Sequence, residues 1–264
     1  VDIAGLIKGA SQSEDIGRGS KFLSHIREVD AIAHVIRCFD DDNIVHVHNQ
    51  VNPVYDKEVI DTELQFKDLE SVDRKIGKVE RTAKSGDAKA KKELTSLLKF
   101  KQALQEGKNA RSVEADEEDL KAVYDLQLLT IKPVIYVANV DEANALNGNK
   151  HVEALRALVK NEGAQVIIVC AAIESQIAEL ESLDDRKAFL AEYGLKESGL
   201  GKLIQATYTL LDLITYFTAG EVEVRAWTIT KGMMAPAAAG VIHSDFEKGF
   251  IRAEVIHFSD FVKL

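Results

Sequence analysis

The sequence has only two cysteines, Cys38 and Cys170, and both stand at the polar end of apolar runs. This sparse usage predicts reduced, buried thiols rather than a disulfide framework. No apolar run approaches the roughly 18 residues that a membrane span requires, and no signal peptide is visible. We therefore expect a cytoplasmic protein that does not bind membranes.

The sequence also lacks the phosphate-binding motif G-x-x-x-x-G-K-[ST], and it starts with Val1 rather than methionine. Because Val1–Ile3 reads as the end of a strand, we expect that the chain has lost its natural start. We also expect that it lacks the last strands of its final domain, and that it does not hydrolyse nucleotide as it stands.

What the sequence does contain is enough apolar material for a packed core. Of its 264 residues, 46% are hydrophobic and 29% are charged, which argues against global disorder. The length allows two or three small domains. The net charge of −10 argues against a protein that coats nucleic acid without specificity.

Three β-branched apolar runs predict buried strands of a parallel sheet: Ala31–Phe39, Pro133–Ala138 and Gln165–Cys170. Between the last two, Lys150–Glu162 has apolar residues at helical spacing and is closed by Gly163. These segments predict a β-α-β unit.

The stretch Asp56–Arg111 predicts an antiparallel helical hairpin with a break at Ser85-Gly86-Asp87. Its first half carries a 3-4-3-4 apolar stripe. The predicted stripe positions are Leu69, Val72, Ile76, Val79 and Ala83, then Leu94, Leu97, Leu98, Lys101 and Leu104.

The hairpin is strongly basic. From Arg74 to Arg111 there are twelve Lys or Arg against four acids, a local charge of +8 that leaves −18 for the remaining residues. A solvated helix surface would explain such charges, but the excess of one sign favours a polyanionic partner. Beyond the hairpin, near the C-terminus, Val222–Ile229 and Phe250–Phe258 read as strands.

Three short motifs suggest a nucleotide site. Asp2-Ile3-Ala4-Gly5 matches D-x-x-G, in which the Asp holds Mg²⁺ and the Gly N–H approaches the γ-phosphate. Cys170-Ala171-Ala172 follows a strand, where GTPases place small residues and a backbone amide beside the base. Each motif ends a predicted strand, which is where α/β proteins bind nucleotides.

The third motif, Asn139-Val140-Asp141-Glu142, occupies the place of the N-K-x-D motif of GTPases. Val140 replaces the Lys and Glu142 replaces the guanine-reading Asp, while Asp141 stands one position early. The longer acid should not fit the guanine edge, so we infer a base site rebuilt for ATP. A simpler alternative is that Asn139 only caps the following turn.

Together with these motifs, several longer blocks resemble the YchF subfamily of Obg-like P-loop ATPases. The resemblance covers essentially the whole chain. The blocks are Ile26–Glu28, His34–Phe39, Asn43–Val47, Val51–Pro53, Tyr216–Gly220, Val224–Thr228 and His243–Ala253.

The resemblance implies an α/β fold, the parallel sheet of a P-loop NTPase (G domain). A helical coiled-coil hairpin is inserted in it, and a C-terminal β-grasp TGS domain follows. The G domain would comprise residues 1–55 and 130–215 and lack the P-loop and switch I. The insertion would comprise residues 56–129, and the incomplete TGS domain residues 216–264.

The resemblance also implies Mg²⁺-dependent hydrolysis of ATP in preference to GTP, with K⁺ as a further candidate cofactor. It implies ribosomal partners and a role in translation or stress regulation, with RNA contacts through the hairpin Arg74–Arg111. Leu6 matches the hydrophobic residue that replaces the water-positioning Gln, and His46 matches a loop histidine proposed to assist hydrolysis. His46 could equally be a loop histidine with no catalytic part. A metal pair with His48 lacks further ligands.

Two other functions compete with this expectation. A non-catalytic adaptor would bind ribosomes or RNA through the basic hairpin and the C-terminal domain. A Ras-like GTPase would require the Lys and Asp that Val140 and Glu142 replace.

Overall fold

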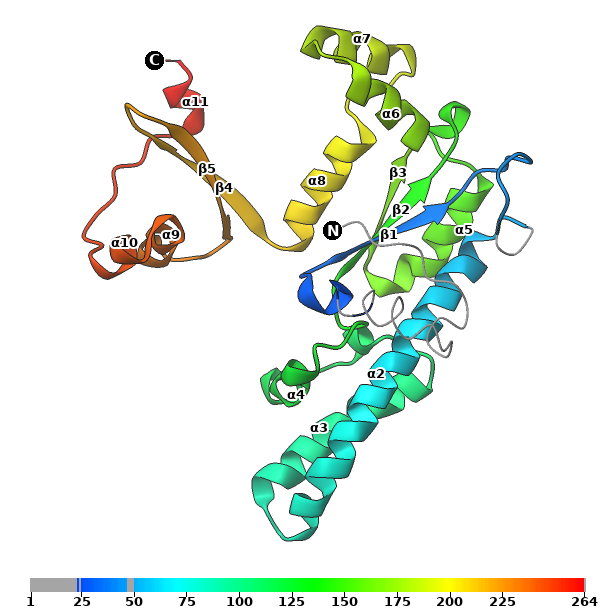
Figure 1. Cartoon of the computed structure of the whole chain (residues 1–264), viewed down its shortest axis with the longest axis vertical. Helices are drawn as coiled ribbons and strands as arrows, with labels where there is room; N and C mark the ends of the chain where they lie inside the picture. The colour runs from blue at the N-terminus through cyan, green and yellow to red at the C-terminus, as the bar shows by residue number, and fades with distance from the viewer. Residues whose placement is uncertain (1–22, 24, 47–49, 264) are drawn as a thin grey trace. The chain divides into compact units, whose positions relative to one another are not determined.

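The computed structural model describes residue 23, residues 25–46 and residues 50–263 (Figure 1). The chain divides into two compact units, Val1–Ala206 and Thr207–Leu264. Within the described part of the chain, no helix combines the length and the apolar character needed to cross a bilayer.

A parallel sheet forms the centre of the first unit. Its described strands are β1 (Ile32–Arg37), β2 (Val134–Asn139) and β3 (Gln165–Val169), in the order β1-β2-β3. The three predicted strands and the α/β class are therefore confirmed. The central strand β2 is buried over its first five residues, because it has a neighbour on each edge and side chains packed on both faces. The predicted strand Val1–Ile3 lies outside the described residues.

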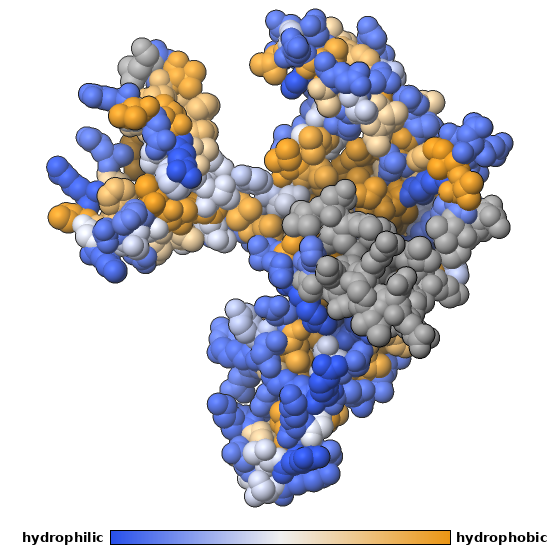
Figure 2. All heavy atoms as spheres, in the orientation of Figure 1, coloured by the Kyte–Doolittle hydropathy of each residue, from blue (hydrophilic) through white to orange (hydrophobic). Residues whose placement is uncertain are grey.

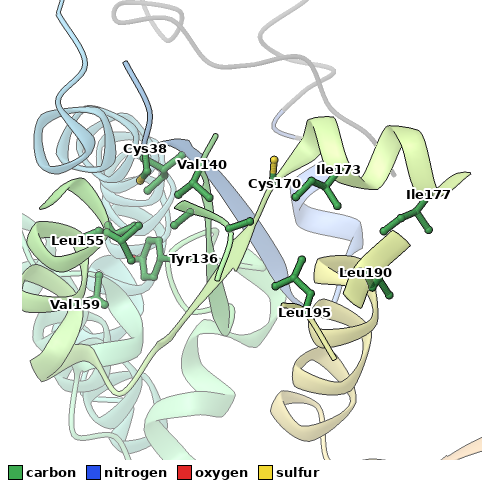
Figure 3. Packing of buried hydrophobic residues seen from close by; sticks show 14 of the residues in the cluster. Cys38, Tyr136, Val140, Leu155, Val159, Cys170, Ile173, Ile177, Leu190 and Leu195 are labelled. Carbon is green, nitrogen blue, oxygen red and sulfur yellow. The ribbon is translucent and has the colours of Figure 1, made fainter. Parts of the chain in front are cut away.

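One face of this sheet packs against helix α5 (Lys150–Val159). His34 of β1 lies beside Tyr136 of β2, and Tyr136 lies beside Val166 of β3, so alternate residues of the strands share one surface. Figure 3 shows Leu155 and Val159 of α5 next to Tyr136. The short helix η4 (Lys160–Glu162) follows, and Gly163 ends it with φ of 67°, as the sequence predicted.

The predicted hairpin is confirmed as two long helices, α2 (Pro53–Lys84) and α3 (Ala88–Gln105), which pack along each other (Figure 1). The Asn52 side chain caps the start of α2, and the Asp87 side chain caps α3 by accepting from Ala90 N–H at 2.8 Å. Gly86 turns the chain with φ of 101°, a conformation that only glycine adopts without strain.

The hairpin core shows where the predicted stripe on α3 was wrong. Leu98 is 48% exposed, whereas Phe100 is fully buried. The buried positions are Leu97, Phe100 and Leu104, at spacings of three and four that continue the packing seam against Val72 of α2.

The chain returns from the hairpin through η1 (Ala110–Ser112), α4 (Glu117–Val123) and η2 (Tyr124–Leu126). Asp68 of α2 holds the segment that leads from the hairpin back to β2. Its buried carboxylate accepts the N–H of Leu129 at 2.8 Å, and the N–H and hydroxyl of Thr130 at 2.7 Å each.

A buried ionic network joins the root of the hairpin to the sheet. Lys57 of α2 is 4% exposed, and its Nζ lies 2.6 Å from Asp61 Oδ2 and 2.5 Å from Glu162 Oε1. The other oxygen of Glu162 accepts from the Tyr136 hydroxyl at 2.9 Å and from the Arg111 guanidinium at 3.1 Å. The insertion and β2 therefore share one set of compensated charges, which we call the root network: Lys57, Asp61, Arg111, Tyr136 and Glu162.

The first unit also contains the short 3₁₀ helix η3 (Glu142–Asn144) and the helices α6 (Ala171–Glu179) and α7 (Leu183–Glu192). Helix α8 (Gly199–Leu210) begins in the first unit and ends in the second. Figure 3 shows Ile173 and Ile177 of α6 and Leu190 of α7 in the same apolar cluster as the sheet residues.

The second unit contains an antiparallel pair, β4 (Leu213–Ala219) and β5 (Val224–Thr230), and the helices α9 (Ala235–Ile242), α10 (Ser244–Lys248) and α11 (Phe258–Phe261). The expected boundary at residue 216 differs from this division, since it would cut β4 in the middle of its ladder with β5.

The strand expected at Phe250–Phe258 was wrong. Residues 251–257 have no regular secondary structure, and Phe258 begins α11. The run has the β-branched composition of a strand, but it pairs with no strand in the described residues, and a strand requires a ladder partner.

We expect the Lys57→Ala variant to lose about 3 kcal/mol of unfolding free energy in the first unit, because removing the buried ammonium leaves two largely buried carboxylates, 15% and 23% exposed, without full compensation. Urea titration followed by the amide NMR signals of β2 measures this loss. Lys67→Ala is the matched control on the same helix, since Lys67 pairs with the half-exposed Glu70 and should cost less than about 1 kcal/mol. Equal losses in the two variants would contradict the role given to the root network.

We expect the same unit to lose stability in mild acid because of His34. Burial is the main cause that lowers the pKa of His34 to about 4, and the cations Lys57 and Arg111 add to it. In the unfolded chain the ring titrates near about 6.5, so the unfolded state binds the proton first as the pH falls. This linkage removes about 2 kcal/mol between pH 7 and pH 5.

Urea titration at pH 7 and pH 5 should therefore show that the unfolding free energy of His34→Gln changes less with pH than that of the wild type. The exposed His25 provides the control, since His25→Gln should keep the wild-type dependence. A His34→Gln variant as acid-sensitive as wild type would refute this assignment.

Candidate nucleotide site

The carboxyl ends of the three parallel strands meet at one edge of the sheet. Arg37 at the end of β1 lies in register with Asn139 at the end of β2, and Asn139 lies in register with Val169 at the end of β3. This edge is where open α/β sheets bind nucleotides. It collects every predicted site residue between Asn139 and Ala172.

Asn139 links the loops that follow β2 and β3. Its side-chain Oδ1 accepts the N–H of Ala171 at 3.1 Å. The alternative that Asn139 caps its own turn is wrong, because Asp141 caps η3 by accepting from Asn144 N–H at 3.0 Å. Asn139 therefore holds the two loops together at the predicted base site.

Val140 and Glu142 lie in opposite environments. Val140 is 2% exposed and belongs to the core, and its N–H bonds to the Val169 carbonyl at 2.9 Å. Glu142 is exposed, and its side chain forms no hydrogen bond or ion pair with another described residue. Glu142 is thus available to solvent or ligand, whereas the Val140 side chain is not.

The small residues after β3 begin helix α6. Cys170 is 4% exposed, and burial raises the pKa of its thiol, so it is an inert packing residue. Cys38 after β1 is also buried and free, and burial followed by the charge of Asp56 raises the pKa of its thiol to about 12. Ala171 and Ala172 are exposed at the first turn of α6. Small side chains there leave the backbone open to a flat base.

The loop from β1 to His46 is organised by Arg37, which the sequence did not single out. Its guanidinium donates to the carbonyls of Phe39, Asp41 and Ile44 at 3.1, 3.0 and 2.9 Å. His46 at the end of this stretch lies 3.0 Å from Asp56, in the first turn of α2.

Helix α5 holds the other side of this loop. The Asn149 amide donates to the Cys38 carbonyl at 2.7 Å, and His151 Nε2 lies 3.2 Å from Asp40 Oδ2. The hydrogen bond from His151 is the main cause that holds the pKa of Asp40 below its usual range. None of these contacts has a sequence signal, because the partners lie more than 100 residues apart.

The predicted phosphate and metal residues Asp2, Gly5 and Leu6 lie outside the described residues, as does His48. Among the residues that are described, no group of three or more His, Cys, Asp or Glu could hold a metal ion. The described part of the candidate site is therefore the predicted base-binding side and the loop of His46, and both the base-site and the Mg²⁺ assignments stay predictions.

The basic hairpin is more neutralised than its composition suggests. Eight of its twelve cations form ion pairs, for example Lys99 with Asp119 at 2.6 Å and Lys101 with Asp73 at 2.7 Å. Figure 2 shows hydrophilic side chains over most of the visible face of the hairpin. The exposed cations without an ion pair to any described residue are Lys78, Arg81, Lys89 and Lys91.

These four residues, which we call the tip cations, flank the turn at Gly86. A cleft of about 510 Å³ lies further along α2, and none of the strand-end residues lines it. Its cationic lining consists of Arg27, Arg74, Lys75 and Lys78. Arg74 and Lys75 are ion-paired and Asp125 also lines the cleft, so Lys78 is the tip cation that this cleft shares.

The sequence is similar to proteins named for ribosome binding. It is 55% identical over 261 residues to the ribosome-binding ATPase YchF of Bacillus subtilis (strain 168), which covers 98% of this chain and 70% of that protein. It is 50% identical over 262 residues to the ribosome-binding ATPase YchF of Escherichia coli O157:H7, covering 99% and 71%.

The fold and the C-terminal sequence agree with these matches. The solved structure of the Schizosaccharomyces pombe YchF GTPase superposes with a TM-score of 0.82 and 37% identity, covering 95% of this chain and 68% of that one. Residues 213–264 match the family model YchF-GTPase_C, described as a protein of unknown function. That match begins where β4 begins.

Proposed function

This chain belongs to the YchF family of P-loop nucleotide hydrolases, and on that premise we propose that it acts as a ribosome-associated, Mg²⁺-dependent ATPase in the cytoplasm. The relatives are named both ATPase and GTPase, so nucleotide preference must be argued from the site. The observation that carries the proposal is the exposed Glu142 after β2, beside the Asn139 bridge to Ala171.

The base site favours adenine for a geometric reason. A GTPase reads guanine through a carboxylate that accepts two N–H groups on one edge of the base. Glu142 places its carboxylate one methylene further from the backbone, and adenine has no such pair of donors. The exposed first turn of α6 at Ala171 and Ala172 would lie against the base.

The remaining assignments complete this proposal. Residues 1–55 and 130–215 form the G domain, residues 56–129 the insertion and residues 216–264 the TGS domain. Asp2 would hold Mg²⁺, Gly5 N–H would meet the γ-phosphate, and Leu6 takes the place of the water-positioning Gln of GTPases. His46 accepts a proton from the attacking water or orients it, and K⁺ is an activating ion.

The tip cations and the cleft are the proposed RNA-binding surface. Ion-paired lysines are already neutralised and release few counterions on binding, whereas unpaired exposed cations bind phosphates directly. The tip cations therefore provide most of the electrostatic attraction to ribosomal RNA in this proposal, and the paired cations nearer the root provide less.

We expect the full-length protein to turn over ATP faster than GTP in Mg²⁺ and potassium buffer, and Glu142→Asp to reduce this preference about tenfold. Steady-state phosphate release with each nucleotide measures the ratio. The matched control is Glu153→Asp, an exposed acid on α5 away from the base site. Faster turnover of GTP than of ATP by the wild type would refute the proposal. If the protein turned over neither nucleotide and bound ribosomes equally well with and without nucleotide, the non-catalytic adaptor would be favoured.

We expect Lys89→Glu/Lys91→Glu to weaken binding to ribosomes at least tenfold and to lower the slope of log K against log salt by about two. Co-sedimentation at several salt concentrations measures both. Lys108→Glu/Lys121→Glu is the control, because it changes the net charge equally at residues that are already paired. Equal losses in both variants would show that only the overall charge matters.

A further inference from the structure

The loop histidine is held by the hairpin. His46 Nε2 lies 3.0 Å from Asp56 Oδ2, and the two side chains are only 15% and 21% exposed. Asp56 belongs to the first turn of α2, and its backbone N–H bonds to the Asn52 carbonyl at 2.9 Å. The histidine that follows β1 is thus in contact with the first helix of the insertion.

The chemistry of the pair determines the state of the ring. A carboxylate can only accept hydrogen bonds, so this contact places a proton on Nε2. In the neutral imidazole the lone pair is then on Nδ1. A carboxylate in this position fixes both the tautomer and the orientation of the ring.

Asp56 stands on a part of α2 that cannot move independently of the sheet. The next residue, Lys57, is the centre of the root network, with contacts of 2.6 Å to Asp61 and 2.5 Å to Glu162. On the other side the loop backbone is fixed by Arg37 through three carbonyls. The position of His46 therefore depends on both the strand end and the hairpin.

We propose that Asp56 is the positioning residue that sets the tautomer and orientation of His46, so that helix α2 couples the hairpin to nucleotide hydrolysis. This inference rests on the proposed function, in which His46 assists the attack on ATP. It adds a physical route by which a partner bound to the hairpin changes turnover: a partner that separates Lys57 from Glu162 frees the first turn of α2, which then withdraws the carboxylate from His46.

The first test needs no turnover. Side-chain ¹⁵N NMR of His46 in this chain, recorded at alkaline pH where the ring is neutral, should show a single tautomer with the proton on Nε2. In Asp56→Ala the signals should shift to a mixture of tautomers, whereas Glu58→Gln, an exposed neighbour on α2, should leave them unchanged. If the His46 signals of Asp56→Ala were the same as those of the wild type, the inference would be overturned, whether or not the protein hydrolyses ATP.

The second test is a double-mutant cycle on ATP turnover by the full-length protein. Asp56→Ala should lower kcat about tenfold to a hundredfold with KM nearly unchanged. It should have no further effect in a His46→Ala background, because a residue that acts through another loses its effect when that residue is absent. A general structural role would instead give additive losses and would overturn the inference.

The cycle also separates this inference from the proposed function. If wild type does not turn over ATP, the proposed function fails, while the NMR result still decides whether Asp56 holds His46. If His46→Ala lowers kcat and Asp56→Ala does not, the ATPase proposal stands and the inference fails.

Discussion

The ammonium group of Lys57 is buried at the junction of the hairpin and the sheet, and a buried charge persists only where its partners compensate it. Asp61 and Glu162 supply this compensation, and Glu162 in turn binds Arg111 and the Tyr136 hydroxyl. These residues come from α2, η1, β2 and η4. The insertion consequently cannot pivot at its root without separating charges in a dry environment, so its orientation is part of the folded state.

This constraint explains how one chain can relate a basic tip to a nucleotide site. The tip cations flank the turn between the far end of α2 and the start of α3, whereas Asp56 and the root residues Lys57 and Asp61 lie at the near end of α2. A continuous helix is stiff, so a force at the tip reaches its first turn. There it meets the loop of His46 and the strand end that carries Arg37. The geometry thus connects a surface suited to phosphates with the residues proposed to act on ATP.

Much of the architecture followed from local patterns. Continuous β-branched runs predicted all three described strands of the parallel sheet, and Gly163 and Gly86 marked a helix end and a turn through their positive φ. The predictions that were wrong depended on contacts between residues far apart in the sequence. The run at Phe250–Phe258 has strand composition but no described strand beside it, and the register of α3 depended on whether Phe100 or Leu98 faced α2. The twelve cations of the hairpin could be counted in the sequence, but which of them form ion pairs could not be predicted from it.

The sequence by itself determined the α/β class, the hairpin, the order of the nucleotide motifs and the family, because periodicity, turn residues and motif spacing are local properties. Tertiary structure alone decided that Asn139 bridges to Ala171, that Asp56 holds His46 and that the tip cations form no ion pair with any residue that the structure describes. Contacts such as Lys57 to Glu162 join residues about a hundred positions apart. Only the packing of the whole unit brings such partners together, since no local rule relates their positions.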